Sequence, residues 1–190
     1  NANKETQIDL AFGVYVWSED IIQRLLLMMS MADFQGRIIL GGPQISYSGI
    51  GLEKHYPNAD IFIRGYGEFA LSTLIKRKSR IQIPGVHYAG EKDLLQQSSV
   101  DLNLLPSPWL NGAIDIRDQG FIRWESQRGC PFKCSFCQYK EAGARLINRQ
   151  LSPCRIGDEI DLFCSNNVKD IAVLDPIFNS TSHSIKILQR

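Results

Sequence analysis

Three of the five cysteines lie close together in the sequence, at a spacing that suits metal chemistry. Cys130, Cys134 and Cys137 form a CxxxCxxC pattern within the segment CPFKCSFC. Three thiolates at this spacing can bind three irons of a four-iron four-sulfur cluster and leave the fourth iron without a protein ligand. The pattern therefore predicts a cluster site.

Two other uses of the three thiols stay open, a zinc site or ordinary buried cysteines. Zinc sites generally have a fourth protein ligand, often from a second closely spaced pair. The candidates for it are Cys154, Cys164, His87 and His183, and no two of them form such a pair. Cys154 and Cys164 are expected to be small apolar residues of a helix, and the isolated histidines, His55 among them, to be surface or capping residues. An odd cysteine count with this crowding does not suit a secreted disulfide framework and favours a reducing cytoplasm.

The elements around the cysteines indicate a strand, a loop, a helix and a second strand. Residues 121–126 (FIRWES) form an expected strand that leads directly into Arg128-Gly129-Cys130. Ser152-Pro153 is a strong helix start, because a capping side chain precedes a proline at the first helical position. Residues 170–174 (DIAVL) form the next expected buried strand, which Asp175-Pro176 ends. A further helix is expected over 183–190.

The first 80 residues alternate apolar, β-branched runs with segments expected to be helical. The expected strands are 8–16, 37–40 and 60–64, and the expected helices are 19–34, 49–56 and 69–78. This order predicts a parallel sheet with right-handed crossovers. Glycines follow the second and third strands, at Gly41, Gly42, Gly65 and Gly67. Open α/β sheets bind ligands at this edge, although the glycines taken alone are more simply explained as tight turns.

Three domains follow from these patterns. Residues 1–80 are expected to form an α/β sheet domain, and residues 119–190 a second α/β unit with the cysteines. Residues 81–118 lie between them, with turn signals at Pro84-Gly85 and Ala89-Gly90 and then a stretch with two prolines. That middle part is expected to be a small ribbon over 83–88 followed by a linker.

Composition excludes several classes of function. The chain has 190 residues, 44% of them hydrophobic and 22% charged, with 21 Lys and Arg against 20 Asp and Glu. A net charge of +1 gives no overall basic surface for nucleic acid or an anionic membrane. No apolar run reaches the length of a membrane span, and the N-terminus has no secretory pattern. We therefore expect a cytoplasmic protein with no nucleic acid or membrane partner.

The segment RGCPFKCSFC resembles the signature of radical S-adenosylmethionine enzymes, including the aromatic residue before the last cysteine. In that family the motif follows the first strand of a partial (β/α) barrel. The resemblance implies that Cys130, Cys134 and Cys137 bind the cluster and that Phe136 lies beside the adenine of S-adenosylmethionine. It also implies that Asp175 ends the second barrel strand near that cofactor, the alternative being a helix cap or turn residue.

The wider series FGVYVWS, ILGGPQIS, DIFIRGYGE, LPSPWL and RGCPFKCSFC resembles the cobalamin-binding branch of that family. These enzymes have a flavodoxin-like (Rossmann-like) cobalamin domain before the barrel, and many are methyltransferases. The chain departs from them in having no DxHxxG loop and in having Gly13 where a serine is common. Its length after Phe121 allows about two βα units of about 30 residues each, so the chain is expected to be cut at both ends relative to the family.

The fold expected is therefore a partial flavodoxin-like parallel sheet followed by the first βα units of a partial TIM barrel. The sequence favours an enzyme that reductively cleaves S-adenosylmethionine to a 5′-deoxyadenosyl radical, using a 4Fe-4S cluster and an electron donor. Cobalamin is the further cofactor of a methyltransferase of this kind, and the substrate is an unspecified small molecule or peptide. The alternatives are a non-catalytic relative that keeps a cluster or metal, and a structural domain in which the cysteines hold zinc.

Overall fold

The computed structural model describes residues 8–76, 80–130, 132, 134–137, 150–178 and 182–189. These residues divide into two compact units, 8–99 and 100–189. Each unit is an α/β structure whose parallel strands are joined through helices. Among the described residues, no helix combines the length and the apolar composition needed to cross a membrane.

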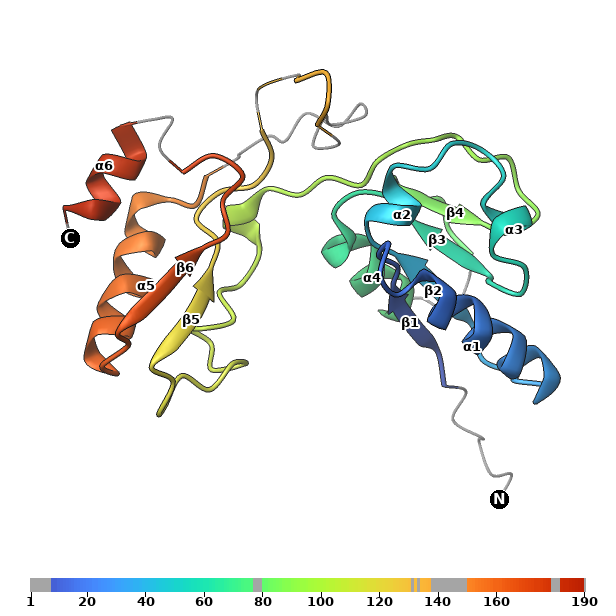
Figure 1. Cartoon of the computed structure of the whole chain (residues 1–190), viewed down its shortest axis with the longest axis horizontal. Helices are drawn as coiled ribbons and strands as arrows, with labels where there is room; N and C mark the ends of the chain where they lie inside the picture. Colours follow the sequence, from blue (N-terminus) through green and yellow to red (C-terminus); the bar gives the residue numbers. More distant parts are fainter. Residues whose placement is uncertain are drawn as a thin grey trace. The chain divides into compact units, whose positions relative to one another are not determined.

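The first unit contains a four-stranded sheet in the order β1-β2-β3-β4 (Figure 1). Its strands are β1 (Leu10–Gly13), β2 (Ile38–Gly41), β3 (Ile61–Ile63) and β4 (Val86–Tyr88). β1, β2 and β3 run parallel, as the sequence predicts. β4 comes from the segment expected to form a separate ribbon, and it instead joins the sheet antiparallel to β3.

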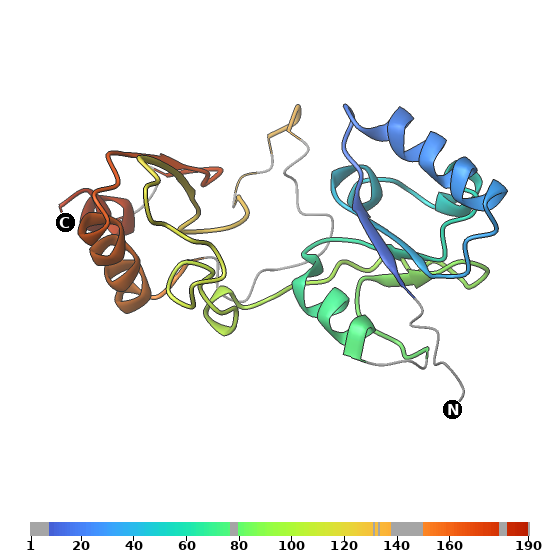
Figure 2. The same ribbon diagram turned by 90° about the horizontal axis from the view of Figure 1, so that it is seen from below.

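Helices cover both faces of this sheet because its strands are apolar on both sides. On one face, α1 (Glu19–Met31), α2 (Pro43–Ser46) and α3 (Leu52–His55) enclose a core with Ile38, Leu40 and Phe62 of the sheet. On the other face, α4 (Gly67–Lys76) packs Ala70 and Leu74 against Ile39, Ile61 and Ile63. Figure 2 shows α1 and α4 on opposite sides of the strands. Successive strand residues therefore serve opposite cores, the pattern expected of a doubly covered parallel sheet. The last residues of the helix expected over 69–78 lie outside the described ranges.

The second unit is built on two parallel strands joined through a helix (Figure 1). After a short 3-10 helix at Leu102–Leu104, its elements are β5 (Phe121–Trp124), α5 (Pro153–Ser165), β6 (Asp170–Val173) and α6 (Ser182–Leu188). α5 begins where the sequence predicts, and the Ser152 hydroxyl accepts a hydrogen bond from the Arg155 N–H at 3.3 Å. Two strands do not establish a barrel, so that part of the expected fold remains a prediction.

Aromatic side chains form part of the contact between α5 and the rest of its unit. Phe163 of α5 meets the rings of Trp124 and Trp109 edge to face, with centroids 6.0 and 5.6 Å away. Cys154 and Cys164 lie on this helix as expected, but both are exposed. The expectation that they act as apolar packing residues is therefore wrong, because the inward face of α5 is filled by Ile156, Glu159 and Phe163.

Candidate functional site

The three clustered cysteines lie just beyond the carboxyl end of β5. Cys134 is exposed, Cys130 and Cys137 are half-buried, and all three thiols are free of disulfides. The Cys137 N–H donates to the Cys134 carbonyl at 3.2 Å, so these two residues form a tight turn. Within the described ranges no three His, Cys, Asp or Glu side chains are close enough together to hold a metal ion.

The donor set nevertheless fits an iron-sulfur cluster in its chemistry. Three unpaired thiols lie in one short segment after a strand, and each has access to solvent. Thiolate sulfur is the usual protein ligand of such clusters. Phe136, expected beside an adenine, is 90% exposed. Its ring is therefore open to contact by a ligand.

Asp175, expected near a cofactor, lies at the end of β6 and bonds to the end of β5. One carboxylate oxygen accepts the backbone N–H groups of Ser126 and Gln127, at 2.8 and 3.1 Å. The other oxygen accepts the Ser126 hydroxyl at 2.5 Å. Ser126 itself is 1% exposed. Asp175 thus holds the backbone four residues before Cys130.

The chain enters and leaves the cysteine segment at neighbouring positions. Gln127 forms an antiparallel bridge with Gln150, and the Leu151 N–H donates to the Ser126 carbonyl at 2.9 Å. The Gln127 side-chain amide donates to the Ile177 carbonyl and accepts from the Gln150 amide at 3.2 Å. These contacts, together with those of Asp175, form what we call the loop base, made of Ser126, Gln127, Gln150, Leu151 and Asp175.

A buried carboxylate fastens α5 to the strand that carries the loop base. Glu159 is 1% exposed and accepts the Trp124 indole N–H at 2.6 Å. Its second oxygen pairs with Arg155 at 2.9 Å. Arg155 also donates to the carbonyls of Leu102 and Leu105, at 3.0 and 2.6 Å. The helix, β5 and the segment before it are therefore joined through two charged side chains.

Gly41, Gly42, Gly65 and Gly67 lie at or just after the carboxyl ends of β2 and β3, the edge where ligands were expected. Gly42 has φ +94°, and a Cβ there would lie 2.9 Å from the Val14 backbone. Gly65 has φ +80°, and a Cβ there would lie 2.4 Å from the Ser98 carbonyl oxygen. Both positions thus need glycine because the chain's own backbone passes close to them. A Cβ at Gly41 or Gly67 would meet Ile63 at ordinary contact distances, 3.6 and 3.7 Å, so packing does not demand glycine there.

This packing explains glycine at Gly42 and Gly65 without a bound ligand. The segment with Ser98 crosses the end of β3, where Ser98 donates to the Arg64 carbonyl and accepts from the Tyr66 N–H, at 2.8 and 3.0 Å. The role of the four glycines in binding a cofactor therefore remains a prediction.

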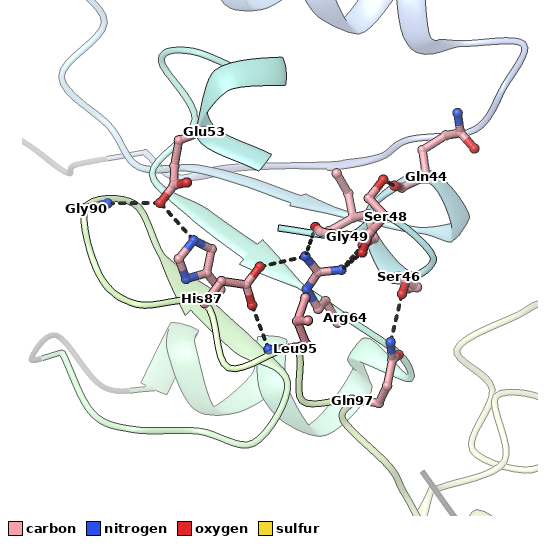
Figure 3. Close-up of polar contacts among 12 residues, drawn as sticks. Gln44, Ser46, Ser48, Gly49, Glu53, Arg64, His87, Gly90, Leu95 and Gln97 are labelled. Atoms are coloured by element: carbon pink, nitrogen blue, oxygen red, sulfur yellow. Dashed lines mark hydrogen bonds and ion pairs between the residues drawn. The ribbon is translucent and has the colours of Figure 1, made fainter. Parts of the chain in front are cut away.

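Arg64, directly after β3, is a buried side chain that organises the same edge (Figure 3). It is 1% exposed and donates to the carbonyls of Ile45, Ser48 and Gly49 at 2.7, 2.5 and 2.9 Å. It also pairs with the Asp93 carboxylate at 2.6 Å. We call this set the arginine hub. It joins the chain after β2 to the chain after β4.

The hub also fixes the ionisation of Asp93. Burial alone would raise the pKa of the Asp93 carboxyl, since it disfavours the charged form. Hydrogen bonds from Arg64 and from the Leu95 N–H outweigh that effect, and the pKa lies below its usual value. Asp93 is therefore a carboxylate held charged by a buried partner.

Two histidines of the first unit pair with glutamates. His87 is 5% exposed, lies against the Phe62 ring and meets the Glu53 carboxylate at 2.9 Å (Figure 3). The expectation of a surface position is wrong for His87, because β4 carries it into the sheet. His55 is more exposed and meets Glu19 at 2.5 Å, which lowers the pKa of the Glu19 carboxyl. The side chain of His183 lies outside the described ranges.

Three residues that these networks depend on have only weak sequence signals. Arg64 ends an apolar strand just before a glycine, and Ser126 follows an aromatic strand in the same way. A polar side chain between a buried strand and a turn is a signal for such a contact. Glu159 had a comparable signal, because it lies between apolar positions of a predicted helix.

Comparison with known proteins supports the resemblance seen in the sequence. No protein-family model matches the chain. Over 94% of its length it is 28% identical to the cobalamin-dependent radical SAM methyltransferase TokK of Streptomyces tokunonensis. Over 94% it is also 26% identical to the 2-(S-pantetheinyl)-carbapenam-3-carboxylate methyltransferase of Streptantibioticus cattleyicolor. Both relatives are methyltransferases. The chain spans 28% of the length of each.

Proposed function

We propose that this chain carries the cluster-binding segment of a cobalamin-dependent radical S-adenosylmethionine methyltransferase. The observation that supports this most is the position of the three free thiols. They follow a parallel strand at its carboxyl end, in a chain similar over nearly all its length to an enzyme of that name. Sites in parallel α/β structures generally form at that end of the strands.

In this proposal Cys130, Cys134 and Cys137 are the cluster ligands. A cluster held by three thiolates supplies an open iron and an electron for the cleavage of S-adenosylmethionine. The chain's own residues hold the thiols in place, since the loop base fixes both ends of the cysteine segment. The exposed ring of Phe136 is then available to the adenine. An external electron donor and a substrate complete the reaction.

Anaerobic reconstitution of the full chain with iron and sulfide tests the proposal. Absorbance and electron paramagnetic resonance would be recorded on the dithionite-reduced protein, before and after adding S-adenosylmethionine. We expect about four irons and four sulfides per chain, the composition of the proposed cluster, and a reduced-cluster signal that shifts on addition. Cys134→Ser should abolish this signal. Cys154→Ser is the matched control, because it removes another exposed thiol outside the segment.

The rival functions predict different results in the same experiment. One zinc per chain, with no iron or sulfide retained, would identify a structural zinc domain. A cluster whose signal does not respond to S-adenosylmethionine would identify a relative that binds the cluster without the chemistry. Either outcome would overturn the proposed function.

A further inference from the structure

Asp175 bonds to the backbone that leads into the cysteine segment rather than to open space. It comes from the end of β6, whereas Ser126 and Gln127 come from the end of β5. The two strands are parallel neighbours, so their carboxyl ends meet at one edge. The carboxylate of Asp175 accepts three hydrogen bonds there.

We propose that Asp175 is a positioning residue, which sets the place where the cysteine segment leaves β5 and so the geometry of the cluster ligands. This inference rests on the proposed function. It differs from the role near S-adenosylmethionine that the family resemblance implies for Asp175. In the structure its carboxylate accepts hydrogen bonds from Ser126 and Gln127 of the chain itself.

All three groups at this place donate to the Asp175 carboxylate, and two of them can only donate. Two are backbone N–H groups, which cannot turn away, and the third is the hydroxyl of a side chain that is 1% exposed. An ionised carboxylate offers about four acceptor positions and no donor. Hydrogen bonds to an ionised acceptor are also stronger than neutral ones. Asparagine could keep the two backbone contacts through its oxygen, and the Ser126 hydroxyl could turn to accept from its amide N–H₂, but the acceptor would no longer be charged.

The effect on the thiols follows from the closure of the loop base. The chain leaves at Gln127 and returns at Gln150, and these two residues are bridged. The Ser126 carbonyl accepts from Leu151 while its N–H donates to Asp175. Removing the carboxylate therefore loosens both ends of the cysteine segment at once. The half-buried Cys130 lies only three residues beyond Gln127.

The test compares Asp175→Ala and Asp175→Asn with the wild-type chain. Asp170→Ala is the matched control, because Asp170 is an exposed aspartate at the other end of the same strand. Amide hydrogen exchange at Ser126 and Gln127 is measured on the cluster-free chain. Iron, sulfide and the g values of the reduced cluster are measured after reconstitution. Circular dichroism melting shows that each variant is folded.

For Asp175→Ala we expect exchange at the two amides about tenfold faster, as the loss of one ordinary hydrogen bond allows. We also expect severalfold less iron and altered g values. Asp175→Asn should lie between Asp175→Ala and the wild type, and Asp170→Ala should match the wild type. The g values separate positioning from simple stabilisation, since a residue that only stabilised the unit would lower yield without changing the spectrum of the folded protein.

Two outcomes distinguish this inference from the proposed function. If the wild type forms the cluster and Asp175→Ala has the same exchange rates, iron content and spectrum, the positioning role is overturned and the function stands. If the wild type forms no cluster, the function falls, and with it the effect on cluster geometry. Should Asp175→Ala fail to fold, Ser126→Ala removes only the hydroxyl contact. Unchanged exchange and spectrum in that variant and in Asp175→Asn would overturn the inference.

Discussion

Removing the Asp93 carboxylate should destabilise the first unit strongly. In Asp93→Ala the Arg64 guanidinium stays buried and charged but loses its only carboxylate partner among the described residues. Three carbonyl acceptors remain, and none carries a charge. Breaking a buried ion pair from one side costs about 3–5 kcal/mol. A domain has about 5–15 kcal/mol of stability in total, so this single change removes a large share.

Equilibrium unfolding in urea measures this cost, followed by far-UV circular dichroism and by hydrogen exchange of peptides from β3. The exchange data report on the first unit alone. Glu91→Ala is the matched control, since Glu91 is two residues away and pairs with Arg80 at 3.6 Å in a contact that is 53–66% exposed. Exposed pairs contribute about 0–1 kcal/mol. If Asp93→Ala lowers the free energy of unfolding no more than Glu91→Ala does, the arginine hub is not the main stabilising contact of this edge.

The ion pair of Arg64 and Asp93 also predicts how the stability of the first unit depends on pH. The pKa of Asp93 is lower in the folded chain than its usual value, which is about 3.9 in an unfolded chain. The folded state therefore binds the proton less readily, and its extra stability is fully present above that pH. It should be lost as the pH falls through the lower, folded-state pKa. We would measure the free energy of unfolding in urea at several values between pH 6 and pH 2. It should fall less steeply with decreasing pH in Asp93→Ala than in the wild type.

Three further substitutions test individual contacts by urea unfolding. Gly42→Ala should cost about 1–3 kcal/mol, because φ +94° is a strained backbone conformation for alanine, whereas Gly49→Ala should cost almost nothing, since its Cβ would meet open space. Glu159→Ala should cost about 3–5 kcal/mol and should alter the fluorescence of Trp124, whose N–H loses its partner. Ser152→Ala should cost about 1 kcal/mol through the lost helix cap. A Glu159→Ala chain as stable as the wild type would contradict the conclusion that this carboxylate stabilises the contact between α5 and β5.

Much of the fold could be predicted from the sequence because apolar runs and turn residues are local signals. The parallel strands of both units and the start of α5 at Pro153 lie where these patterns place them. β4 was missed as a member of the sheet. Its three residues are too few to carry a periodic pattern, and its position depends on pairing with β3.

The contacts of the candidate site could be predicted only in part. The cysteine spacing is visible in the sequence, and so is the turn at Asp175. The partners of Asp175 are not, because Ser126 lies 49 residues away in the chain and only the pairing of β5 with β6 brings the two together. The same is true of Arg64 and Asp93. Their contact depends on where the chain after β4 crosses the sheet edge.

The loop base has a consequence for the order in which the protein is made. The cysteines emerge from the ribosome before α5 and β6, yet the residue that fastens Ser126 and Gln127 follows β6. Chains are synthesised at about 5–20 residues per second, so for a few seconds the thiols exist without the contact that fixes the backbone before them. A cluster delivered to the nascent chain would meet thiols before Asp175 has bonded to Ser126 and Gln127. Delivery after β6 has paired with β5 would meet them with that contact in place.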